Sequence, residues 1–193
     1  HQAQPSVTTV RDRLWALYET VGAKAELASM LVAEALSNED EDEKFEQLQK
    51  AGNLFLESGD DGQEKAIAPL EEAVRIRQDD HPSTILLVDA YTNTQRYAEA
   101  GKLLEPAIAA RGTRRSPQLG ELQHRMSRLA SVAGDKNLQL QWLNVAFDSD
   151  RRNGEIVNDL ARLAMELGEL DTALSALRTV TVSKIEGPLS RAE

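Results

Sequence analysis

The sequence predicts an all-α protein, a solenoid of about five antiparallel helix hairpins. Three observations predict this fold: a leucine recurs along the 193 residues, small residues stand at fixed distances from it, and a turn residue precedes it. Such self-similarity is typical of helical repeat arrays, in which each unit is one supersecondary element. The leucines follow one another at intervals of 39, 34, 39 and 34 residues and are Leu31, Leu70, Leu104, Leu143 and Leu177.

The residues around each leucine have helical spacing. Four residues before it stands a small or apolar residue, and Gln139 breaks this series: Leu27, Ala66, Ala100 and Ala173. Three residues after the leucine stands a second set of small or apolar residues, in which Glu34 is the exception: Ala73, Ala107, Ala146 and Val180. Positions i, i+4 and i+7 lie on one face of a helix. Small residues on that face allow two antiparallel helices to approach closely.

Turn residues end the helix that comes before each leucine helix. Glycine can adopt the left-handed conformation that terminates a helix, and four glycines occupy this slot: Gly22, Gly59, Gly134 and Gly168. Gln95 fills the slot in the third unit. Four residues earlier stand an aromatic residue or alanine: Tyr18, Phe55, Tyr91, Ala130 and Ala164. Each unit is therefore predicted to be helix, tight turn, helix.

The elements follow in order from these signals. First helices are expected at 6–21, 43–58, 82–94, 116–133 and 153–167, and second helices at 23–37, 62–78, 97–110, 136–149 and 170–183. Polar segments join the units, and an insertion is expected around 60–62. Pro69 and Pro106 lie inside second helices, where each should remove a backbone hydrogen bond and bend the helix.

The hairpins are expected to form one repeat domain over residues 6–183, because a single hairpin cannot bury its apolar face alone. The approximate units are 6–38, 43–79, 82–111, 116–150 and 153–183. Gly187 and Pro188 indicate a break and a new helix start. Residues 184–193 are therefore expected to begin a further repeat or a capping helix, and the parent protein is expected to continue.

The pattern resembles the tetratricopeptide repeat (TPR), whose period is about 34 residues, as in a larger array of the bacterial type. The best matches are Leu48…Gly52…Phe55…Gly59…Ala66…Leu70…Ala73, Tyr91…Tyr97…Ala100…Leu104…Ala107 and Ala161…Ala164…Gly168…Leu170…Ala173…Leu177…Val180. The first and fourth units depart from it, since Trp15 occupies a normally small position and Gln139 replaces an alanine. The resemblance implies a right-handed superhelix whose first helices line a concave groove.

The resemblance also implies which side chains face that groove. They lie one residue after, or three before, the small residue of each first helix: Gln49, Asn53, Ile85, Asp89, His124, Arg128, Asn158 and Arg162. In the first unit, Asp12 and Ala16 are less secure because Trp15 interrupts the motif. The Lys/Asn/Arg set with which chaperone-tail TPR domains hold a terminal carboxylate is missing here. These side chains are equally consistent with an exposed polar surface that binds nothing.

Composition and charge exclude several classes of function. The net charge is −10, and residues 1–80 contain 8 Lys+Arg against 18 Asp+Glu, whereas residues 81–193 contain 14 of each. Nucleic-acid binding is not expected, because it needs a basic footprint. No apolar stretch approaches the ~20 residues of a bilayer-spanning helix, so membrane insertion is not expected. The absence of cysteine excludes disulfides and thiolate chemistry and leaves the compartment open.

Four segments contain residue types that could carry chemistry, and none predicts a cofactor or a metal site. The acidic run 39–43 favours a helix N-terminus. Residues 148–154 resemble the start of a calcium loop, but Arg152 stands where an oxygen ligand is needed. His81 and His124 have no partner ligand nearby in sequence, and the arginines of 111–115 fit a solvated linker.

The sequence contains no phosphate loop, nucleophile elbow or zinc-protease motif, so no enzyme is predicted. The favoured function is a non-catalytic module that binds a protein or peptide segment in the groove. The alternative is a structural spacer that stacks on flanking repeats or on itself.

Overall fold

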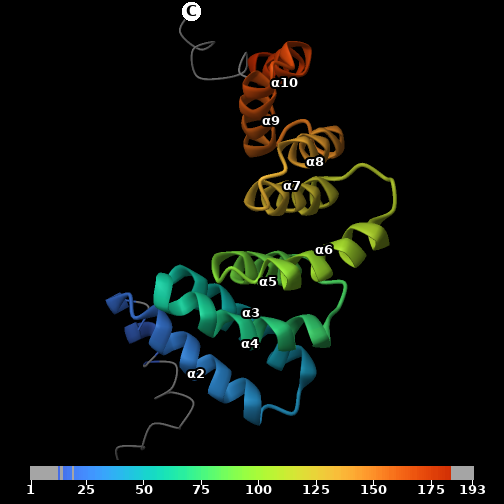
Figure 1. Ribbon diagram of the computed structural model, residues 1–193. Helices are drawn as coiled ribbons and strands as arrows, with labels where there is room; N and C mark the ends of the chain where they lie inside the picture. The colour runs from blue at the N-terminus through green and yellow to red at the C-terminus, as the bar shows by residue number, and fades with distance from the viewer. Residues whose placement is uncertain (1–12, 14, 19, 184–193) are drawn as a thin grey trace, which may run out of the picture. The chain divides into compact units, whose positions relative to one another are not determined.

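The computed structural model describes residues 13, 15–18 and 20–183, and every regular element within them is an α-helix (Figure 1). The helices are α2 (Lys24–Ser37), α3 (Glu41–Glu57), α4 (Asp60–Ile76), α5 (His81–Asn93), α6 (Tyr97–Arg111), α7 (Pro117–Val132), α8 (Lys136–Ser149), α9 (Gly154–Leu167) and α10 (Leu170–Ser183). These bounds lie within two residues of the predicted ranges. Residues 13, 15–18, 20 and 21 are also helical. The predicted start of a further helix at 184–193 lies outside the described residues.

The chain divides into two units, one up to Ala100 and one from Gly101 on, and α6 begins in the first and ends in the second. In the N-terminal unit α2 packs on α3, α3 on α4 and α4 on α5, and α3 also touches α5. In the C-terminal unit α7 packs on α8, α8 on α9 and α9 on α10 (Figure 1). Within each unit these helices therefore pack against the next one in the chain, as helix hairpins require.

Side-chain caps explain where several helices begin. Asp40 lies just before α3, and its Oδ1 accepts hydrogen bonds from the backbone N–H groups of Asp42 at 2.9 Å and Glu43 at 3.1 Å. The acidic run 39–43 therefore caps a helix N-terminus, as expected from its position. The same role belongs to Asp80 before α5, Ser116 before α7, Asp135 before α8 and Asn153 before α9.

The predicted turn residues end the first helices in the left-handed half of backbone space. Gly168 follows α9 with φ 79° and ψ 10°, and its N–H donates to the carbonyl of Ala164. Gln95, at the same repeat position, has φ 62° and is the one non-glycine residue with positive φ in the described chain. The turn thus forms even without glycine, although a side chain there carries a steric penalty.

Four of the five repeated leucines are buried at the centre of their hairpins, whereas Leu177 of α10 is 39% exposed. Leu31, Leu70, Leu104 and Leu143 are at most 1% exposed. In the C-terminal unit Leu143 belongs to a cluster with Ala146 of α8 and with Ile156, Val157 and Leu160 of α9. In the N-terminal unit Ala35, Phe45, Leu48 and Ala73 form a second cluster. Small residues permit this packing: a Cβ added at Gly52 would lie 2.4 Å from Leu70 Cγ.

Two features differ from simple sequence expectations. Residues 60–62, expected as an insertion, form the first turn of α4, because Gly62 packs directly on the carbonyl oxygen of Phe55. Helices α4 and α6 continue through Pro69 and Pro106, respectively. Neither proline ends its helix, and the bend predicted at each stays a prediction. None of the helices in the described range has the length and apolar composition needed to cross a bilayer.

The close contact at Gly62 predicts a specific loss of stability. A Cβ at this position would lie 2.0 Å from Phe55 O and 2.2 Å from Ser58 Oγ, and a backbone oxygen cannot easily move away. We expect Gly62→Ala to lower the free energy of unfolding by about 3 kcal/mol, measured by urea denaturation. The matched control is Gly101→Ala, where the nearest atom is 3.9 Å away and alanine should stabilise α6 by about 0.5–1 kcal/mol. Equal effects of the two substitutions would contradict this packing.

Glu72 on α4 predicts a pH dependence of stability. Arg75 donates to its carboxylate at 2.6 and 2.7 Å and Lys44 of α3 lies 3.1 Å away, which lowers the pKa of Glu72 from 4.5 to about 2. A lowered folded-state pKa stabilises the protein above pH 4.5, and this stabilisation is lost as the pH falls toward 2. We expect Glu72→Gln to cost about 1 kcal/mol at pH 7, because the carboxylate is partly exposed, and nothing near pH 2. Urea denaturation of both proteins between pH 2 and pH 7 measures the difference in their free energies of unfolding. A difference that does not change with pH would refute the prediction.

Candidate protein-binding face

Four of the eight predicted groove residues lie on the two first helices of the C-terminal unit. His124 and Arg128 come from α7, and Asn158 and Arg162 come from α9. Two contacts join α7 to α9. The Nε2 atom of His124 lies 2.9 Å from Oδ2 of Asp159, and the Nη2 atom of Arg128 lies 3.3 Å from Oε2 of Glu155. The structure therefore places these predicted residues on one continuous face, called here the α7/α9 face.

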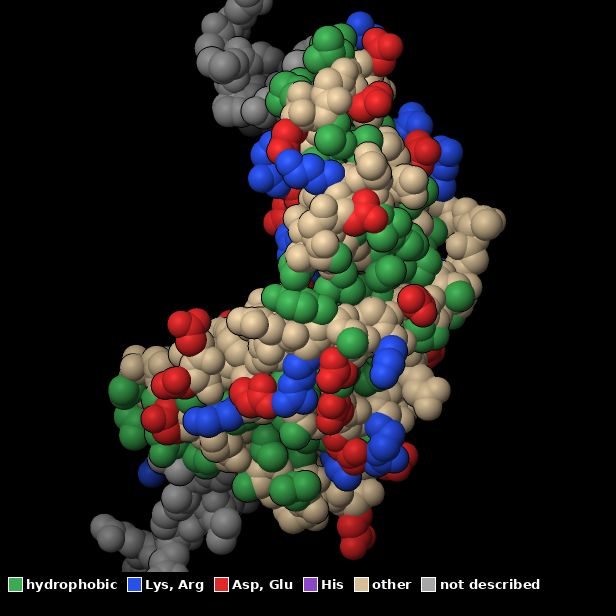
Figure 2. All heavy atoms as spheres, viewed as in Figure 1, with side chains coloured by type: hydrophobic (Ala, Val, Ile, Leu, Met, Phe, Trp, Pro, Cys, Tyr) green, Lys and Arg blue, Asp and Glu red, His purple; other side chains and the backbone are tan. Residues whose placement is uncertain are grey.

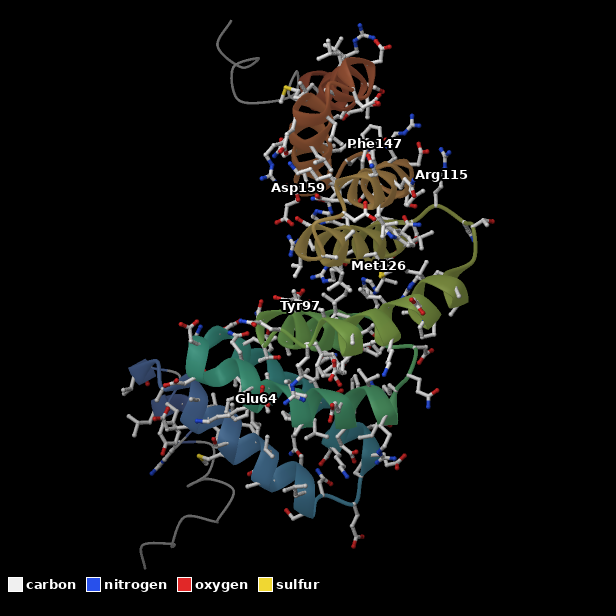
Figure 3. All side chains as sticks on the ribbon, viewed as in Figure 1. Glu64, Tyr97, Arg115, Met126, Phe147 and Asp159 are labelled. Atoms are coloured by element: carbon white, nitrogen blue, oxygen red, sulfur yellow. The ribbon has the colours of Figure 1, made fainter. Side chains whose placement is uncertain are left out.

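His124 and Asp159 form the buried part of this face. The His124 side chain is only 4% exposed, and that of Asp159 is 30% exposed; Asp159 is labelled on α9 in Figure 3. Burial raises the pKa of Asp159, but hydrogen bonds from His124 and Arg162 outweigh it and hold the pKa below its ordinary value. Asp159 is thus an anion that accepts from His124 Nε2–H. This bond joins α7 to α9 and leaves His124 little surface to offer a partner.

Arg128 and Arg162 form the exposed part of the α7/α9 face. Arg162 donates to Asp159 Oδ1 at 2.7 Å and has 74% of its side chain exposed. Arg128 is 48% exposed, and its partner Glu155 is 75% exposed. Exposed ion pairs of this kind contribute about 0–1 kcal/mol each. The Arg128 guanidinium group can therefore exchange Glu155 for another carboxylate at little energetic cost. Arg162, which is 74% exposed, has further N–H donors for a second carboxylate while Asp159 stays bonded to His124.

Further ion pairs surround the two arginines. Arg125 pairs with Glu121 at 3.2 Å along α7, and Lys136 at the start of α8 pairs with Glu166 of α9. The hydrogen bond from Lys136 lowers the pKa of Glu166. Figure 2 shows such basic and acidic side chains next to one another on the surface of the C-terminal unit. The result is a hydrated surface of alternating charge.

The other four predicted residues lie on α3 and α5 of the N-terminal unit. Gln49 Nε2 donates to Asp80 Oδ2 at 2.9 Å and to Ser83 Oγ at 2.7 Å, so it links α3 to the start of α5. Asn53 donates to Glu57 at 2.9 Å. Asp89 is half-buried, and Ile85 is only 8% exposed. Gln49 thus links two helices and Ile85 is part of the core, while Asn53 and Asp89 are half-buried.

Sequence reasoning missed the acidic members of the α7/α9 face. Asp159 lies three residues before Arg162, and Glu155 lies three before Asn158, spacings that place neighbours on one helix surface. A search for acids i−3 to the predicted basic residues would have found Asp159. The contact of His124 with Asp159 spans 35 residues of sequence and could not be found from local spacing.

The other segments weighed for chemistry have structural roles. Asp148 pairs with Arg151 at 2.8 Å, and Asn153 Oδ1 accepts hydrogen bonds from the N–H groups of Glu155 and Ile156 to cap α9. Arg114 and Arg115 are exposed between α6 and α7. In the part of the chain that the structure describes, no group of three or more His, Asp or Glu side chains is arranged to hold a metal ion.

Solved structures with the same fold include MamA structures and the TPR-like repeats of a kinesin light chain. The MamA RS-1 ArsTM double mutant matches with a TM-score of 0.68 at 14% identity, covering 96% of this chain and 99% of that one. A second MamA crystal structure matches with a TM-score of 0.67 at 15% identity, covering 96% and 95%. The TPR-like repeats of a putative kinesin light chain from Podosopora anserina match with a TM-score of 0.66 at 21% identity, covering 95% and 97%. No protein-family model and no curated protein sequence matches the chain.

These similarities, together with the helix order and the buried repeat leucines, define a TPR-type, all-α solenoid fold. The family resemblance of the sequence is thereby confirmed at the level of fold.

The buried part of the α7/α9 face predicts a stability difference between two neighbouring acids. Asp159→Ala leaves the buried His124 without its partner and should lower the free energy of unfolding by about 1–3 kcal/mol. Glu155→Ala removes only an exposed pair and should change it by about 0.5 kcal/mol or less. Urea denaturation at pH 7 measures both. If Glu155→Ala proves the more damaging, the division into a buried and an exposed part is wrong.

Proposed function

We propose that the chain is a protein-interaction module that binds a protein or peptide segment along its first helices. The observation that carries this proposal is the α7/α9 face, where the guanidinium groups of Arg128 and Arg162 are exposed and each is paired with a carboxylate of α9. Exposed guanidinium groups that are held in place by weak ion pairs suit reversible recognition. A partner can bind them without unfolding any part of the protein.

The preferred partner segment carries carboxylates. A guanidinium group binds a carboxylate through two parallel hydrogen bonds, which gives both energy and orientation. Glu155 reaches Arg128 through a single bond of 3.3 Å, and a bidentate partner would improve on this contact. Asn158, exposed beside them on α9, offers a donor and an acceptor for the partner backbone.

The proposed mode differs from a chaperone carboxylate clamp. That clamp needs basic side chains on the first helices of several units, whereas the α3 and α5 set in this chain is Gln49, Asn53, Ile85 and Asp89. The acidic excess of residues 1–80 would also repel an anionic segment there. Binding of an acidic segment is therefore confined to the C-terminal unit.

A peptide selection tests this function. The protein would be immobilised and challenged with a library of random displayed peptides, and the dissociation constants of selected peptides would be measured by calorimetry. We expect acidic sequences to be enriched. Arg128→Glu with Arg162→Glu should weaken their binding by at least about tenfold, because two favourable charges become repulsive. The helical circular dichroism should stay unchanged.

The matched control is Arg114→Glu with Arg115→Glu, which makes the same change of net charge in the linker between α6 and α7. At physiological salt, this linker variant should bind the selected peptides with a dissociation constant within about twofold of that of the unaltered protein, because exposed charges beyond a Debye length are screened. If the linker variant weakens binding as much as the face variant, the attraction is non-specific. If neither variant affects the selected peptides, the α7/α9 face is not the binding site.

A further inference from the structure

Trp15 occupies a repeat position at which the repeat pattern has a small residue. The equivalent residue of the second unit is Gly52, where a Cβ would already lie 2.4 Å from Leu70 Cγ. An indole ring cannot occupy so narrow a space between two closely packed helices. Trp15 is accordingly half-buried, and it lines an open cavity of the N-terminal unit together with Leu31, the first repeat leucine.

The cavity has an apolar base and a charged rim. Its volume is about 230 Å³, below the roughly 300 Å³ of ordinary small-molecule pockets, so it suits a single side chain. Leu31 is only 1% exposed and forms the base with Trp15. The other lining residues lie on one face of α3, at helical spacings i, i+3, i+4 and i+7, and are Glu43, Glu46, Gln47 and Lys50.

Lys50 indicates the kind of group that this cavity attracts. Its ammonium nitrogen lies 5.6 Å from the centre of the Trp15 ring, within the range of a cation–π contact. Lys50 is an exposed residue of α3, and a long flexible side chain at the surface can move aside. The indole ring is therefore already in contact with a cation of the chain itself, and the same attraction is available to a cation from a partner.

The charge around the cavity also favours a cation. Glu43 and Glu46 place two carboxylates on the rim, against the one ammonium group of Lys50. The Glu43 carboxylate is held in place by a hydrogen bond of 3.0 Å from Asn38 Nδ2. Residues 1–80 contain 18 Asp+Glu against 8 Lys+Arg, so the wider electrostatic field attracts cations as well.

We propose that this cavity, called here the Trp15 pocket, binds a lysine or arginine side chain of a basic protein segment. The alkyl stem of the bound side chain lies against Trp15 and Leu31, and its charged end reaches Glu43 and Glu46 at the rim. Lys50 competes for the same groups and is displaced when the segment binds. The Trp15 pocket and the α7/α9 face take ligands of opposite charge, so either proposal can fail without the other.

The indole N–H signals of the two tryptophans, Trp15 and Trp142, report this binding by nuclear magnetic resonance. The unaltered protein is titrated with a capped peptide of alternating lysine and serine. We expect a saturable shift of the Trp15 signal, whereas the signal of Trp142 on α8 should keep its position. A peptide with diaminobutyrate in place of lysine has the same charge on a shorter stem. It should bind at least about fivefold more weakly, because less apolar surface is buried.

A pair of lysine variants separates the pocket from general attraction. Lys50→Gln removes the competing cation and should tighten peptide binding by about threefold. The matched control, Lys65→Gln, makes the same change of charge at an exposed residue of α4 that does not line the pocket. It should change the dissociation constant by less than about 1.5-fold at physiological salt, because exposed charges away from the ligand are screened.

A pair of acid variants tests the rim. Glu43→Gln with Glu46→Gln should weaken peptide binding by at least about fivefold, since both carboxylates that face the ligand are lost. Asp61→Asn with Asp79→Asn makes the same change of charge at exposed residues that do not line the pocket. This control should weaken binding by less than about twofold, and circular dichroism should show unchanged helicity in both double variants.

Several results would overturn the proposal. A Trp15 signal that does not respond to the lysine peptide would show that the pocket does not bind it. Equal binding of the two peptides, or equal effects of pocket and control variants, would show attraction to the overall negative charge alone. A Trp15 signal that shifts when the protein is diluted without peptide would show that a second copy occupies the pocket.

Discussion

Close approach of helices around one repeated leucine is the constraint on which the rest of this structure depends. Leu70 lies so near α3 that a Cβ at Gly52 would overlap it, and Leu143 is enclosed by apolar residues of the next helix. A leucine can fill the space between two helices only if their facing residues are small. Because the leucine of one hairpin is covered by the next, stability is shared between neighbours along the chain.

The same register determines which polar residues hold the repeats together and which stay available. Gln49 and His124 occupy equivalent repeat positions, and each reaches a polar group of the following first helix, Ser83 or Asp159. In these two units the position therefore joins one first helix to the next. One helical turn after His124, Arg128 pairs with the exposed Glu155, and another carboxylate could replace Glu155 in this ion pair. The proposed binding therefore relies on the outer turn, since Gln49 and His124 at the inner position already hold partners within the protein.

The exposed face of α10 follows from the same physics. A helical repeat array has no closed core, so each second helix has an apolar side that its own hairpin cannot cover. The apolar side of α8 is covered, because Leu143 is buried against residues of α9. The corresponding side of α10 is exposed at Leu174 and Leu177. Leu143 and Leu177 hold the same repeat position, so their different exposure comes from the surrounding helices and not from the repeat position.

From the sequence alone we could predict the fold class, the bounds of α2 to α10 to within two residues, the turn positions including Gln95, and four of the five repeat leucines as core. These features depend on local spacing, which a helix converts directly into faces. Only the tertiary structure decided that His124 is buried against Asp159, that Gly62 touches Phe55, and that Leu177 alone among the repeat leucines is exposed. Each of these depends on what a neighbouring helix brings to the contact, and repeat spacing does not encode the neighbour's side chains.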